Sequence, residues 1–197
     1  MAVFKYNAER PFRSNPDLHI HYWGRENCAP GHSVGPGVRE IYKIHFIHEG
    51  TGSVTVGEFS HTLKEGQAFL TYPHIVTHYA ADVQTPWTYS WIAFTGEQVE
   101  YLLSKTSLSP EHPVFPMDQN LMPELYDRLT QAVQITDSLD LPLKAILYQF
   151  FALLLQTFPA SPDILPLPKQ KSIYVEQCLH FLHSHYCENV TVEMMSS

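Results

Sequence analysis

Aromatic and polar side chains alternate along two segments that are typical of β-strands. Trp87, Tyr89 and Trp91 share one face of the later segment, because successive side chains on a strand point to opposite faces. One face of the earlier segment carries Arg39, Ile41, Lys43, His45 and Ile47. Aromatic rings pack against apolar C–H surfaces, and polar side chains exchange hydrogen bonds with hydroxyl groups. This combination suits a small ligand rich in hydroxyl groups, such as a sugar.

The proposed contacts come from both segments and from a strand between them. They are Arg39, His45, Tyr79, Tyr89 and Trp91, with His32 and His78 as secondary candidates. A second interpretation places Tyr89 and Trp91 in an ordinary hydrophobic core and Arg39 in a surface ion pair. The sequence leaves both interpretations open.

Twelve histidines raise the alternative of a metal-dependent enzyme. Two histidines can hold one metal from a single strand when they are two residues apart, because they then share a face. His45 and His48 are three apart and point to opposite faces. His19 and His21 have the right spacing, but no Glu follows shortly to complete a ligand set. We therefore expect no metal, no cofactor and no catalytic residue, with a small metal-dependent dioxygenase or isomerase as the alternative function.

The elements that must position these side chains divide the chain into a β half and a helical half. Residues 17–96 contain short segments rich in β-branched and aromatic residues, separated by Gly and Pro. The predicted strands are Leu18–Trp23, Arg39–His48, Ser53–Val56, Phe59–Leu63, Gln67–Tyr72, Thr77–Ala81 and Trp87–Phe94. Seven short strands at close spacing predict a sandwich or barrel, whose interior can hold one small ligand.

Residues 97–159 show the spacing of amphipathic helices instead. The predicted helices are Glu97–Lys105, Asp118–Gln134 and Leu143–Phe158. Leu121, Leu125 and Leu129 form one apolar stripe, so the last two helices are expected to pair as a hairpin. The remaining face would either pack on the barrel or form a homodimer interface, and the pattern does not separate these two possibilities.

The ends of the chain differ from both halves. Residues 1–16 are expected to form an N-terminal arm. Residues 160–170 contain three prolines within seven residues, which favours an extended linker. A new helical pattern then spans Lys171–Cys187, and the chain ends soon after Thr191 opens another. Residues 171–197 therefore suggest the start of a further domain that this chain does not complete.

Composition limits the partners and the compartment. The 197 residues include 44% hydrophobic and only 16% charged residues, enough for one substantial core. The formal charge of −8 would repel a phosphate backbone, so any DNA-reading residues must lie in the missing part. Three scattered cysteines without a CxxC pair fit a reducing cytosol, and no apolar run is long enough to span a bilayer. We expect a cytoplasmic protein without a membrane partner.

Four stretches together resemble the AraC-type transcription regulators, particularly the sugar-utilisation regulators of Gram-positive bacteria. They are the Glu49-Gly50-Thr51-Gly52 turn, the run from Leu63 to Pro73, the Trp87–Gly96 run, and the segment Trp23–Cys28 with residues 30–36. Residues 174–192 are in turn similar to the opening of the helix-turn-helix domain of that family.

The resemblance implies a fold and a function. The fold would be a cupin-like barrel, a double-stranded β-helix or jelly roll, followed by a helical hairpin and a truncated helix-turn-helix domain. The function would be control of carbohydrate uptake or utilisation genes in response to a mono- or oligosaccharide, by a homodimer that binds DNA through its missing part. Tyr79, Tyr89 and Trp91 match sugar-contacting positions of that family, whereas Arg39 and His45 follow a loop of different length.

Overall fold

The computed structural model describes residues 3–6, 17–116, 127–131, 140–160 and 181. Residues 1–160 form one compact unit and residues 161–197 form another. The predicted linker beyond Ala160 and the predicted start of a DNA-binding domain lie outside the described residues, apart from Phe181. The fold below is that of the first unit.

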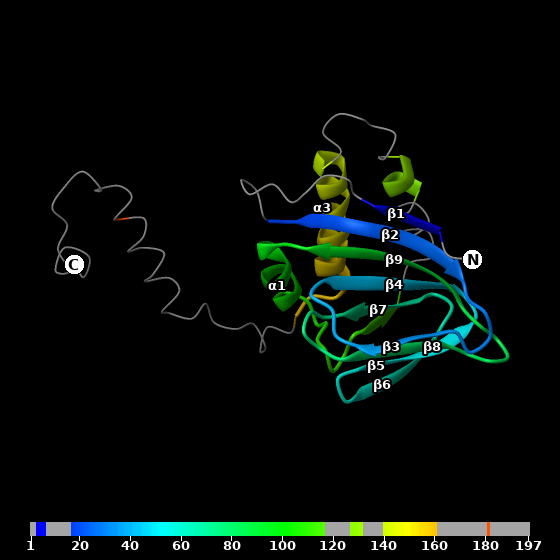
Figure 1. Cartoon of the computed structure of the whole chain (residues 1–197). Helices are drawn as coiled ribbons and strands as arrows, with labels where there is room; N and C mark the ends of the chain where they lie inside the picture. Colours follow the sequence, from blue (N-terminus) through cyan, green and yellow to red (C-terminus); the bar gives the residue numbers. More distant parts are fainter. Residues whose placement is uncertain (1–2, 7–16, 117–126, 132–139, 161–180, 182–197) are drawn as a thin grey trace. The chain divides into compact units, whose positions relative to one another are not determined.

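Two antiparallel sheets form the barrel (Figure 1). The first sheet has the order β1 (Val3–Tyr6), β2 (His19–Asn27), β9 (Thr88–Thr95), β4 (Tyr42–Glu49), β7 (Gln67–Thr71) and β10 (Val114–Pro116). The second sheet has the order β3 (Ser33–Gly37), β8 (Thr77–Ala81), β5 (Thr51–Val56) and β6 (Phe59–Lys64). The strand order is not the chain order, so the chain passes repeatedly between the sheets, as in a jelly roll.

Both faces of the first sheet are buried. On β9, Tyr89 and Trp91 point into the barrel and join one hydrophobic cluster, whereas Ile92 and Phe94 belong to a second cluster on the outer face. This double burial explains why seven consecutive residues of β9 are buried, where a half-exposed strand would alternate.

Helices cover the outer face of the first sheet. In the described part of the chain, helices α1 (Glu97–Ser104) and α3 (Asp140–Thr157) are accompanied by a short helical segment at residues 127–131. Figure 1 shows α3 crossing the strands of the first sheet, where Phe150 packs edge-on against Phe46 at 6.2 Å between ring centroids. No helix among the described residues is long and apolar enough to cross a membrane.

Most predicted strands are present, and the differences lie at turns. The strand predicted from Arg39 begins at Tyr42, because residues 39–41 carry the chain from the second sheet to the first. Three strands were not predicted: β1, β3 and β10. The predicted N-terminal arm therefore contributes an edge strand through Val3–Tyr6, which pairs with β2.

The predicted helical hairpin falls only partly within the structure. Arg128 donates a hydrogen bond to Gln149, so the helical segment 127–131 contacts α3. Leu129 is fully buried in the cluster between α3 and the first sheet, which accounts for its apolar side chain without a partner copy. Leu121 and Leu125 lie outside the described residues, and their part in a dimer stays a prediction.

Candidate ligand-binding site

A cavity opens between the two sheets at one end of the barrel. Its volume is about 30 Å³ for water-sized molecules, and the empty space around it, which includes open solvent, is about 410 Å³. It is lined from β3, β4, β7, β8 and the loops beside them by Val34, Gly35, Gly37, Arg39, Ile41, Lys43, His45, Thr71, Tyr72, Ile75, Thr77 and Tyr79. A cavity of this size has room for one or two water molecules, so a larger ligand must displace side chains at the mouth.

His45 is the central polar group of this cavity. Its imidazole is 1% exposed and stacks on Phe69, with 4.3 Å between ring centroids. Neither ring nitrogen has a hydrogen-bond partner among the described residues. Burial, with a smaller effect of the Lys43 charge, holds the pKa of His45 well below its usual value. The ring is therefore neutral and offers one donor and one acceptor to whatever enters the cavity.

Two basic residues, Lys43 and Arg39, line the cavity. Lys43 points into the barrel beside His45, and its Nζ lies 5.5 Å from the centre of the Tyr22 ring. Burial and the charge of Arg39 lower the pKa of Lys43 to about 8. Arg39 donates to the carbonyl oxygen of Val38 at 3.2 Å and is exposed, so it belongs to the mouth. The cavity thus combines hydrogen-bond donors with an aromatic wall.

Tyr89 and Trp91 lie in the barrel interior, and the Tyr89 ring packs near two residues that line the cavity, His45 and Tyr79. Tyr89 lies 5.5 Å from the His45 ring and 6.2 Å from the Tyr79 ring, and Trp91 lies 5.3 Å from Tyr89. The Tyr89 hydroxyl donates to the Glu26 carboxylate at 3.3 Å. Both residues are almost fully buried and neither lines the cavity. Of the five principal residues predicted from the sequence, the structure therefore brings Arg39, His45 and Tyr79 to the cavity surface.

The two secondary candidates lie elsewhere. His78 precedes Tyr79 on β8 and points to the opposite face of the second sheet, where it lines a separate depression with Val76 and Thr55. His32 follows β2, and its Nε2 lies 3.8 Å from a Glu26 carboxylate oxygen. Neither histidine belongs to the cavity that His45 lines.

Several residues that line the cavity were not predicted from the sequence. Val34 comes from β3, which was not predicted because its sequence, Ser-Val-Gly-Pro-Gly, has the Gly and Pro content of a loop. Tyr72 follows β7 and also lines the cavity, and its hydroxyl has no hydrogen-bond partner within the described part of the chain. The alternation of Phe69 and Thr71 on β7 was the available signal for this wall.

The two facing antiparallel sheets, with a cavity between them, define a cupin-like domain of the jelly-roll type. Residues 19–151 match the family described as the AraC-like ligand binding domain. The chain belongs to this family.

Curated relatives resemble the chain over most of its length. It is 33% identical to the Msm operon regulatory protein of Streptococcus mutans over 91% of this chain and 65% of that protein. It is 28% identical to the raffinose operon transcriptional regulatory protein RafR of Pediococcus pentosaceus, over 96% of this chain and 68% of that protein. It is 26% identical to the lactose operon transcription activator of Staphylococcus xylosus, over 90% of this chain and 64% of that protein. The chain thus spans about two thirds of the length of these relatives.

Proposed function

We propose that the chain is the effector-sensing part of a transcription regulator that controls genes for carbohydrate uptake or utilisation. The observation that carries the proposal is the cavity around His45, a buried neutral imidazole without a partner among the described residues. A saccharide is the proposed effector, because the relatives are named as regulators of raffinose and lactose operons. The same names favour a regulator over a metal-dependent enzyme.

The cavity offers distinct contacts to a saccharide. His45 can donate one hydrogen bond and accept one, which suits a hydroxyl group that does both. Lys43 and Arg39 add donors that have no competing carboxylate among the residues that line the cavity. The Tyr79 ring provides an aromatic wall for the C–H face of a sugar, and Tyr89 holds that wall in place.

We infer that binding is linked to a rearrangement, because the cavity leaves only about 30 Å³ to water-sized molecules and a sugar ring needs more. A ligand that binds an opened mouth more tightly than the closed one shifts the population toward the open arrangement. Arg39 and Ile41 belong to the segment that crosses between the sheets, so movement there would pass from the cavity to both sheets. This is the proposed origin of the regulatory signal.

The remaining partners follow from the same proposal. The formal charge of −8 on the whole chain disfavours DNA binding by these residues alone, so DNA would be bound by a helix-turn-helix domain that begins near residue 171 and continues beyond this chain. A homodimer would form through the apolar stripe that begins at Leu121 and Leu125. The protein would act in the cytoplasm and would not be an enzyme.

The direct test is a thermal-shift screen of the chain against mono- and oligosaccharides, followed by calorimetry on any that stabilise it. Binding to the folded state raises the melting temperature by mass action. Lys43→Met retains an unbranched side chain of similar length and removes the ammonium group. It should weaken saccharide binding about tenfold, as expected for the loss of one charged hydrogen bond. Lys64→Met, on an exposed position of β6, is the matched control and should bind normally. A screen without any stabilising saccharide, or equal affinity in both variants, would contradict the proposal.

A further inference from the structure

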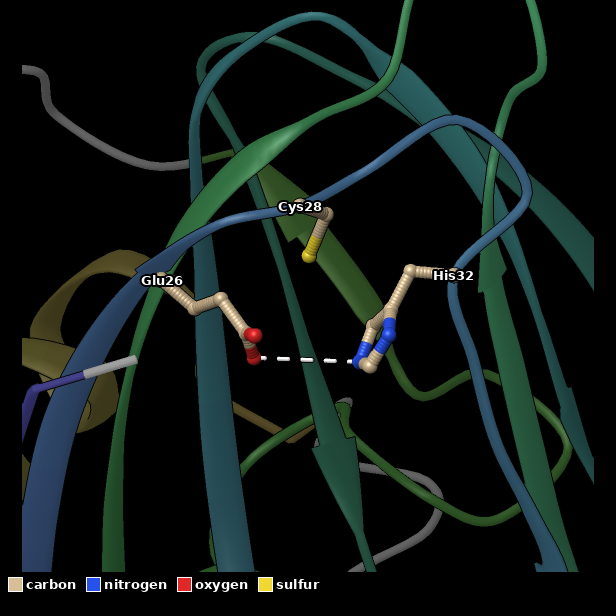
Figure 2. Close-up of side chains that lie close together, drawn as sticks. All are labelled: Glu26, Cys28 and His32. Carbon is tan, nitrogen blue, oxygen red and sulfur yellow. Dashed lines mark ion pairs between the residues drawn. The ribbon is translucent and has the colours of Figure 1, made fainter. Parts of the chain in front are cut away.

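Three different metal-ligating side chains converge where β2 ends (Figure 2). They are Glu26, Cys28 and His32, and their nearest ligand atoms all lie within 4.8 Å of one another. None of the three lines the cavity around His45. Figure 2 shows the Glu26 carboxylate and the His32 imidazole facing each other across the space below the Cys28 sulfur.

The local sequence explains why they meet. Glu26 and Cys28 are two residues apart along an extended segment and so share its inward face. A tight turn follows, in which the His32 amide donates to the Ala29 carbonyl at 3.0 Å. Gly31 has φ +69°, a left-handed conformation that glycine adopts without strain. This turn reverses the chain and returns the His32 side chain to the face that carries the other two.

The backbone around the cluster is held at both ends. The Cys28 amide donates to the carbonyl of Trp87 at 3.2 Å, which extends the pairing of β2 with β9. The carbonyl of His32 accepts from the Ala81 amide at 2.9 Å. The three ligand positions are therefore fixed by the barrel, and only their side chains need to adjust.

The side chains are somewhat farther apart than the ligands of a bound zinc ion, and small side-chain movements would bring them to that spacing. The Glu26 and His32 atoms are 3.8 Å apart, too far for a direct hydrogen bond. Ligand atoms on one tetrahedral zinc ion lie about 3.4–3.6 Å apart, from metal bonds of about 2.0–2.3 Å. Glu26 also accepts a hydrogen bond from Tyr89, as metal-bound carboxylates accept from an outer shell that orients them. Cys28 is buried, whereas His32 is partly exposed, which gives an ion access from solvent.

We propose that Glu26, Cys28 and His32 form a zinc-binding site with three protein ligands and one position open to solvent. One sulfur, one nitrogen and one oxygen donor form a set that zinc accepts, whereas magnesium and calcium prefer oxygen donors alone. The site is distinct from the effector cavity. Tyr89 lies between the two, because its hydroxyl donates a hydrogen bond to Glu26 and its ring packs 5.5 Å from the His45 ring without lining the cavity. The histidine spacing along single strands did not predict this site, because its three ligands are of different types and one of them comes from beyond a turn.

The test uses cobalt as a spectroscopic substitute for zinc, on the untagged full chain. Cobalt bound by a thiolate gives a charge-transfer band that oxygen and nitrogen ligands do not produce. We expect one equivalent of cobalt to produce this band and one equivalent of zinc to abolish it. Cys28→Ser should remove the band, and the double variant Cys178→Ser/Cys187→Ser should retain it, which excludes the other two cysteines as its source.

His32→Ala keeps the hydrophobic core intact and guards against a folding artefact of the Cys28 substitution. It should weaken cobalt and zinc binding by about tenfold or more. His112→Ala, an exposed histidine outside the cluster, is the matched control and should bind like the wild type. Absence of a thiolate band in the wild-type chain, a band that survives Cys28→Ser, or equal affinities of His32→Ala and His112→Ala would each overturn the proposal. Because none of these readouts involves a saccharide, the outcome is independent of the proposed effector function.

Discussion

Replacing His45 with Phe should stabilise the chain and abolish effector binding at the same time. The imidazole already stacks on Phe69 with an angle of 8° between the ring planes, so a phenyl ring can adopt the same orientation. The substitution removes one buried donor and one buried acceptor that have no hydrogen-bond partner within the described residues. The ligand would lose the same two groups.

The magnitude follows from opposing effects. A buried polar group without a partner costs about 1–3 kcal/mol, and His45 contributes two such groups. A larger ring can cost about 1–3 kcal/mol through overpacking. The adjoining cavity of about 30 Å³ gives the added ring atom room, which keeps this cost at the low end. Taking both effects at their low ends, about 2 kcal/mol gained and about 1 kcal/mol lost, we expect a net gain of at least about 1 kcal/mol in the free energy of unfolding. Each kcal/mol is equivalent to about 2–4 °C in melting temperature.

Urea denaturation followed by tryptophan fluorescence measures the stability, and calorimetry with the stabilising saccharide measures the affinity. His112→Phe is the control, because it makes the same change at an exposed position. A His45→Phe variant that is destabilised by more than about 1 kcal/mol would show that the ring nitrogens already have partners in the folded chain. A stable variant that still binds the saccharide would remove His45 from the site.

Two further predictions concern stability. His48 accepts or donates a hydrogen bond with Ser90 at 2.8 Å, and burial lowers its pKa to about 4. In the unfolded chain His48 takes up a proton below about pH 6.5, whereas in the folded chain it does so only below about pH 4. The free energy of unfolding should therefore decrease as the pH falls from about 6.5 to about 4. We expect a decrease of about 1–2 kcal/mol, because the partial exposure of His48 reduces the effect. His48→Gln should flatten this part of the curve of unfolding free energy against pH, and an unchanged slope would contradict the assignment. Gly52→Ala should cost more than about 3 kcal/mol or prevent folding, because its Cβ would lie 2.3 Å from the Trp87 ring. Gly57→Ala, which meets no atom closer than 3.7 Å but has φ +60°, should cost only about 1–2 kcal/mol in the same urea assay, and equal losses would refute the steric argument.

Alternation along the strands made much of the barrel predictable. The prediction for Thr77–Ala81 agrees with β8 at both ends, because the β-branched and aromatic residues are bounded by turn residues. Ser33–Gly37 forms β3 despite two glycines and a proline, and its pairing with β8 supplies the hydrogen bonds that local propensity does not indicate. Tertiary pairing of this kind is not encoded in the pattern of a single segment.

The candidate site was predictable only in part, for a related reason. Alternation showed correctly that Lys43 and His45 share a face, and both line the cavity. Alternation also placed Tyr89 and Trp91 on the inward face. It could not show that His45 lines the cavity whereas these two aromatic residues do not. The depth of a side chain along the barrel depends on the register between strands, such as His45 opposite Trp91, and the sequence of one strand does not contain that register.

The cluster of Glu26, Cys28 and His32 at the end of β2 was not predicted from the sequence, because its three residues differ in type. Glu26 and Cys28 share a strand face, but His32 reaches them only through the turn that Gly31 allows. A search for two like ligands at fixed spacing does not detect this arrangement.

A crystal structure of the chain with the saccharide that stabilises it most would test the central claim directly. We expect saccharide density between the sheets, with hydroxyl groups within hydrogen-bond distance of the His45 ring nitrogens and of Lys43 Nζ. Residues 39–41 should be displaced to admit it. Saccharide density only in the outer depression beside His78, or only at the end of β2 beside Glu26, would contradict the assignment of the His45 cavity as the effector site.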